Sequence, residues 1–65
     1  MQMKPGLIVY KFINNYTQNV IAFFSIEETH KSLRGKLEDR RQQLAIDNGI
    51  NLSGIYYLQA SEDEL

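Results

Sequence analysis

Three short segments of the sequence favour β-strands, and each of them is apolar on both of its faces. These segments are residues 7–13, 20–24 and 55–59. Side chains along a strand alternate between two sides, so a strand with one face in water usually has a polar residue at every second position. These segments lack that alternation. Their composition is typical of a sheet that is covered on both sides.

Only one segment favours an α-helix, and one helix covers only one face of a sheet. Its apolar residues form a narrow stripe on a helical wheel: Ile26, Leu33, Leu37 and Leu44. Ser25 and Glu28 have the spacing of a capping box, which marks a helix start. The pair Asn48-Gly49 is typical of a left-handed helix end. We therefore predict a helix from about residue 26 to about residue 47.

The order of these segments predicts a small, single-domain α+β fold with the order β-β-α-β. The polar segment 14–19 is short enough to join two antiparallel strands as a hairpin. We expect a three-stranded, largely antiparallel sheet with the helix packed on one face, and residues 1–65 as one domain. Residues 1–5 and 60–65 are expected to be frayed.

Simple alternation divides the strand residues into two groups, without indicating which group the helix covers. In the first strand, Tyr10 and Phe12 face away from Leu7 and Val9. In the second strand, one side carries Val20, Ala22 and Phe24, and the other side carries Ile21 and Phe23. In the third strand, one side carries Ile55 and Tyr57, and the other side carries Tyr56 and Leu58.

The size of the chain makes an uncovered apolar face significant. A domain of 65 residues is near the lower limit for folding alone. The chain contains no cysteine and one histidine, His30, which excludes a disulfide or a zinc site made of cysteine and histidine. We expect neither a metal nor a cofactor, and a structural role for His30. Contact with another chain is then the favoured way to stabilise so small a domain.

The sheet face left free by the helix is the first candidate for a functional surface, because exposed apolar patches of a few hundred Å² usually mark an interaction surface. We expect a non-enzymatic binding or regulatory module that forms a homodimer or binds a protein partner, through this face or through a strand edge. The expected contact residues are Tyr10, Phe12, Tyr56 and Leu58. In the alternative case of a self-sufficient monomer, Ile50 and Leu52 of the loop after the helix would cover part of this face.

A group of basic residues on the predicted helix supports a second hypothesis, a nucleic-acid-binding adaptor. The residues are Lys31, Arg34, Lys36, Arg40 and Arg41. A helix with this density of cations can follow a phosphate backbone. However, the formal net charge of the chain is −1, and pairs such as Glu38 and Arg41 have the spacing of ion pairs within a helix. We therefore regard protein binding as the main hypothesis.

The sequence contains no pattern that is typical of an enzyme. There is no cysteine nucleophile, no serine in an elbow motif and no glycine-rich phosphate loop, and no small-molecule substrate is evident. The apolar run 7–13 is much shorter than the roughly 20 residues that span a bilayer, and no cleavage site follows it. We expect no membrane association and a cytoplasmic location.

Overall fold

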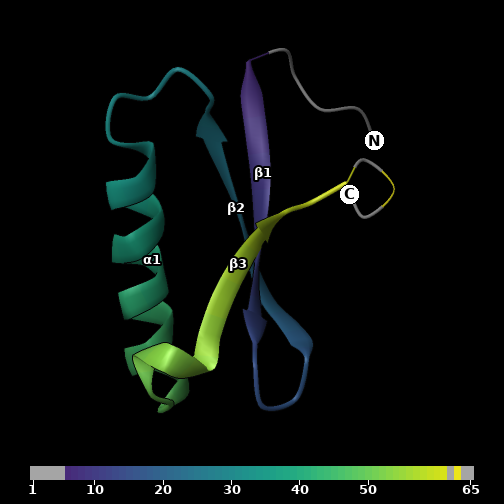
Figure 1. Cartoon of the computed structure of the whole chain (residues 1–65), viewed down its shortest axis with the longest axis vertical. Coiled ribbons are helices and arrows are strands. Elements are labelled where there is room, and N and C mark those ends of the chain that lie inside the picture. Colours follow the sequence, from purple (N-terminus) through teal and green to yellow (C-terminus); the bar gives the residue numbers. More distant parts are fainter. Residues whose placement is uncertain (1–5, 62, 64–65) are drawn as a thin grey trace.

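The computed structural model describes residues 6–61 and 63, and it has the predicted α+β fold (Figure 1). The elements in chain order are β1 (Leu7–Asn14), β2 (Asn19–Glu27), α1 (Leu33–Asn48), the short 3₁₀ helix η1 (Leu52–Gly54) and β3 (Ile55–Gln59). β1 is the central strand of the sheet, whose order is β2-β1-β3, and it pairs antiparallel with both neighbours. The predicted β-β-α-β order and the antiparallel sheet are confirmed.

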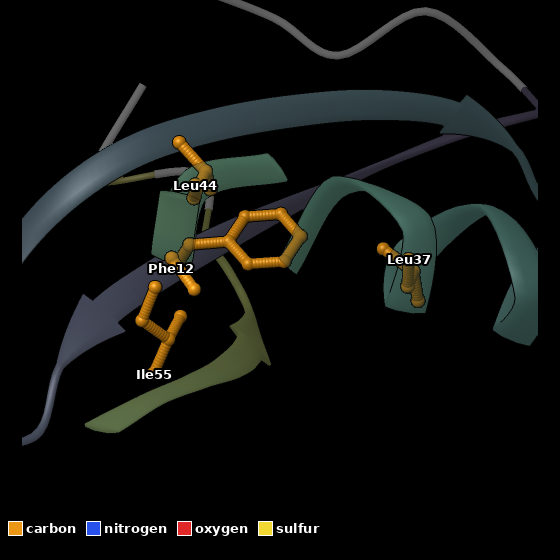
Figure 2. Packing of buried hydrophobic residues seen from close by; sticks show 5 residues of the cluster. Phe12, Leu37, Leu44 and Ile55 are labelled. Carbon is orange, nitrogen blue, oxygen red and sulfur yellow. The ribbon is translucent and has the colours of Figure 1, made fainter. Parts of the chain in front are cut away.

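α1 covers the face of the sheet on which Phe12 lies. Phe12 has no exposed surface, and it forms one buried cluster with Ile55 of β3 and with Leu37, Leu44 and Ala45 of α1 (Figure 2). Half-buried residues of all three strands surround this cluster: Tyr10, Ile21, Ala22, Phe24 and Tyr57. The helix thus presents its apolar side to the side of β1 that carries Tyr10 and Phe12.

A β-bulge in β2 changes the face on which Val20 lies. Phe12 lies opposite Ala22, whereas Ile13 lies opposite Val20, so Ile21 is an extra residue in β2. A bulge shifts the alternation of side chains by one position. Val20 therefore shares the face of Ile13, away from α1, and Ile21 packs against the core under the helix. The predicted grouping of Val20 with Ala22, and of Ile21 with Phe23, is wrong because strict alternation does not hold across a bulge.

The helix begins seven residues later than predicted. β2 continues through Ser25, which lies opposite Val9, and through the buried Ile26, which lies opposite Ile8. Ser25 therefore caps no helix, and α1 starts at Leu33. Strand pairing gives Ile26 backbone hydrogen bonds, and it buries Ile26 on the side of the sheet that α1 covers. An apolar residue at this position therefore fits a strand as well as it fits the predicted helix. Ser32 precedes the helix without a side-chain cap, and its N–H donates to Nδ1 of His30 over 3.0 Å, a structural role for this histidine.

The end of the helix is the one that the sequence predicts. Gly49 has the left-handed φ of +64°, and its N–H donates to the carbonyl oxygen of Ile46 over 3.2 Å. The N–H of Ile50 donates to the carbonyl oxygen of Ala45 over 3.1 Å. These two bonds form a Schellman motif, and Ile50 then packs against the core.

The last strand continues beyond its assigned end. The N–H of Ala60 donates to the carbonyl oxygen of Val9 over 2.8 Å, and Ala60 is buried, although the sequence analysis expects it to be frayed. The same expectation for residues 1–5, 62, 64 and 65 falls outside the described residues.

One glycine in α1 and one directly after it are expected to respond in opposite directions to replacement by alanine. Gly49→Ala should lower the free energy of unfolding by about 1 kcal/mol, because a Cβ disfavours the left-handed conformation. Gly35, in the first turn of α1, has only the Cβ of Ser32 within 4 Å of an added Cβ, at 3.9 Å. Gly35→Ala should therefore raise this free energy by up to about 1 kcal/mol. Urea denaturation measures both changes, and a loss of stability in Gly35→Ala would contradict the described helix start.

Candidate functional site

The side of the sheet away from α1 carries two cross-strand rows of side chains. In one row Ile13 of β1 lies between Val20 of β2 and Tyr56 of β3. In the next row Lys11 lies between Phe23 and Leu58. We call the surface formed by these two rows the open sheet face.

Large apolar side chains are exposed on both margins of the open sheet face. The exposed fractions are 44% for Val20, 49% for Phe23 and 50% for Leu58, whereas Ile13 between them is buried. Val20 and Phe23 belong to one edge strand and Leu58 to the other edge strand, so the apolar surface extends over the full width of the sheet. Several large apolar side chains exposed on one face of a small domain are typical of an interaction site.

Two polar groups lie among these apolar residues, and both are engaged within the chain. The hydroxyl of Tyr56 donates to Oε1 of Gln18 in the hairpin loop over 2.9 Å. The same loop is attached to η1, because the N–H of Asn15 donates to the carbonyl oxygen of Gly54 over 2.7 Å. Lys11 is half-buried and takes part in an interaction of its own. Interactions within the chain thus hold the polar side chains of the open sheet face in place.

The four residues that the sequence analysis expects on one contact surface lie on two faces of the sheet. Tyr56 and Leu58 lie on the open sheet face. Phe12 is wholly buried under α1, and Tyr10 shares its side of β1, so neither contributes to the open sheet face. The correction follows from the register, in which Phe12 lies opposite Tyr57 and not opposite Tyr56. The prediction of a binding role for Tyr56 and Leu58 is not tested by this placement.

The most exposed residues of β2 on this surface are missing from the sequence-based set. Phe23 follows from alternation once it is known that α1 covers Phe12. Val20 does not follow, because the bulge at Ile21 leaves no clear signal in the sequence.

The basic residues of α1 do not form one continuous surface. Arg41 is only 22% exposed and holds the helix to the segment that follows it. Its Nε donates to the carbonyl oxygen of Ile55 over 2.6 Å, and a terminal nitrogen donates to the carbonyl oxygen of Leu52 over 2.9 Å. The other terminal nitrogen forms an ion pair with Glu38 at 2.9 Å, which the spacing predicts. Arg41 therefore has a structural role, whereas its predicted contact with nucleic acid is not tested by this placement.

The remaining four basic residues are exposed: Lys31, Arg34, Lys36 and Arg40. Lys31 lies in the turn before α1 rather than on the helix. Arg34 and Arg40 are six residues apart, which places them about 120° apart around the helix axis. These cations point to at least two sides of the molecule, so a single phosphate backbone would not contact all of them along a straight path.

Two further properties concern metals and membranes. Within residues 6–61 and 63, no group of three or more His, Cys, Asp or Glu side chains is placed to hold a metal ion. In the same part of the chain, no helix has the combined length and apolar character that crossing a membrane requires.

Comparison with known proteins adds no family to this description. No protein-family model matches the chain, and neither a curated protein nor a solved structure matches it. Function is therefore inferred from the surfaces of the chain itself.

Arg41 is expected to contribute to stability, unlike the exposed Arg34 two turns earlier in α1. Arg41→Met should lower the free energy of unfolding by about 2 kcal/mol, since it removes charge-assisted bonds to two carbonyl groups and to Glu38. Arg34→Met is the matched control, because Arg34 is exposed, and it should change this free energy by less than about 0.5 kcal/mol. Urea denaturation measures the free energy of unfolding of both variants. Equal losses of stability would contradict the structural role of Arg41.

Proposed function

We propose that the chain is a non-enzymatic protein-binding module that associates with a second copy of itself through the open sheet face. The observation that carries the proposal is the exposure of Val20, Phe23 and Leu58, each about half exposed, on the face that α1 leaves uncovered. In a symmetric dimer the same surface packs against itself, so its apolar residues meet apolar residues.

The thinness of the domain supports this proposal. The described chain extends over 34 × 27 × 14 Å, which corresponds to one sheet and one helix without a third layer. Strands with two apolar faces need cover on both sides. A second sheet packed face to face, about 10 Å away, would supply the missing layer.

The size of the surface predicts a weak dimer. Three strands about 4.8 Å apart, with about five residues each at about 3.3 Å, form a face of roughly 14 × 17 Å, or on the order of 240 Å². Stable interfaces of standard size bury about 1,200–2,000 Å² in total. In addition, the two Lys11 residues would approach one another across a symmetric interface, and like charges oppose association. We therefore expect a dimer that dissociates on dilution.

The alternative function, a nucleic-acid-binding adaptor, has less support. Four exposed cations remain after Arg41 is assigned its structural role, and they point in different directions. A nucleic-acid adaptor would bind a heparin resin with an affinity that falls steeply with salt. Dimerisation through an apolar face would not weaken in this way, because salt does not screen apolar contacts. Salt dependence thus distinguishes the two functions.

Serine substitutions on the open sheet face are expected to weaken self-association. Phe23→Ser and Leu58→Ser should each raise the dimer dissociation constant by about tenfold, because each removes a large apolar contact. Analytical ultracentrifugation over a dilution series measures this constant, and circular dichroism confirms that the variants are folded.

Ile46→Ser is the matched control for these two variants. Ile46 is the most exposed of the large apolar residues in the described part of the chain, at 75%, but it lies on α1. This variant should dimerise as the wild type does. A wild-type chain that stays monomeric up to millimolar concentration would contradict the proposal, and so would a dimer that only Ile46→Ser weakens.

A further inference from the structure

A pocket of about 270 Å³ lies between the first half of α1 and the sheet, on the opposite side from the open sheet face. Its lining comes from β1, β3, α1 and the turn before α1: Tyr10, Tyr57, Leu33, Arg34, Leu37 and Lys31. The pocket thus combines aromatic, aliphatic and cationic groups, and none of these side chains belongs to the surface proposed for self-association.

The aromatic side of the pocket is held in place by the core. The rings of Tyr10 and Tyr57 meet edge to face, with their centroids 5.9 Å apart and an interplanar angle of 87°. Tyr57 also contacts the ring of Phe12, at a centroid distance of 5.5 Å. Because Phe12 is wholly buried in the core, its contact with Tyr57 holds the two tyrosine rings in place. The aromatic surface therefore exists before any ligand arrives, which lowers the entropic cost of binding.

The tyrosine hydroxyls of the pocket remain available for a ligand. Within the described part of the chain, no hydrogen bond joins the hydroxyl of Tyr10 or Tyr57 to another residue, whereas Tyr56 on the other face bonds to Gln18. A phenolic hydroxyl can donate to an anionic oxygen. Two such donors beside apolar side chains are typical of a pocket that fixes the orientation of a polar ligand.

Two cations at the rim complete the site. Lys31 and Arg34 are exposed, and neither forms an ion pair with a described carboxylate. Glu38, four residues beyond Arg34, could have neutralised it, but Glu38 pairs with Arg41 instead. The rim therefore keeps two positive charges next to the tyrosines.

We infer that this pocket binds a small ligand in which one aromatic ring carries a phosphate group. The ring would pack against Tyr10, Tyr57 and the leucines, and the phosphate would contact Lys31 and Arg34. Ligand pockets usually have volumes of about 300–1,000 Å³, so this volume suits a single-ring compound and not a dinucleotide. The charge of the phosphate complements the two cations, and a phosphate oxygen can accept a hydrogen bond from a tyrosine hydroxyl.

A titration followed by two-dimensional amide NMR tests this inference with phenyl phosphate as the probe. We expect saturable shifts at Tyr10, Tyr57 and the first half of α1. Phenol and inorganic phosphate should each bind about ten times more weakly, because each lacks one half of the recognised group. O-phosphotyrosine and pyridoxine 5′-phosphate then distinguish two biological sources of a single ring that carries a phosphate group, an amino acid and a vitamin derivative, and the tighter binder identifies the source.

Two double variants show whether binding of phenyl phosphate depends on the positions of the positive charges or only on their number. Lys31→Gln/Arg34→Gln should weaken the binding of phenyl phosphate by about tenfold, since exposed charge contacts contribute about two- to fivefold each. Lys36→Gln/Arg40→Gln removes the same charge from two positions of α1 that do not line the pocket, and it should leave the affinity unchanged. Because all four residues are exposed, the variants are expected to fold. Equal losses in both double variants, or equal affinities for phenyl phosphate and inorganic phosphate, would overturn the inference.

Discussion

The burial of Phe12 between the sheet and α1 is the constraint on which the other features of this domain depend. Phe12 lies on the central strand, and its cluster with Ile55, Leu37 and Leu44 joins β1, β3 and the helix (Figure 2). Because α1 is the one α-helix within residues 6–61 and 63, its packing on this face leaves the face of Phe23 and Leu58 uncovered. The same packing anchors the tyrosine pair beside the helix. The position of one phenylalanine thus determines which side of the sheet carries each proposed surface.

Much of the fold is predictable from the sequence because local signals agree with it. The hairpin follows from the polar segment between two apolar runs, and the helix end follows from Gly49, which has a left-handed conformation. The helix start is not predictable from the same rules. The spacing of Ser25 and Glu28 fits a capping box, but Ile26 gains burial and backbone hydrogen bonds from pairing with Ile8. Tertiary pairing therefore overrides a local helix signal at this point.

The candidate site is less predictable than the fold, because it depends on contacts between distant segments. Alternation separates Tyr56 from Tyr57, but only the register shows that Tyr57 joins Phe12 under the helix. The bulge at Ile21 then moves Val20 to the open sheet face. The spacing of Glu38 and Arg41 predicts their ion pair, whereas the carbonyl groups that Arg41 also binds belong to η1 and β3, which no helical periodicity can reveal.

The proposal on which the functional interpretation depends is that a second copy of the chain covers the face of the sheet opposite α1. Isotope-filtered NMR on a mixture of labelled and unlabelled chains tests this claim most directly, because it detects contacts between copies only. We expect intermolecular contacts that involve Val20, Phe23 and Leu58 and leave out Ile46. Contacts confined to α1, or no intermolecular contacts at millimolar concentration, would contradict it.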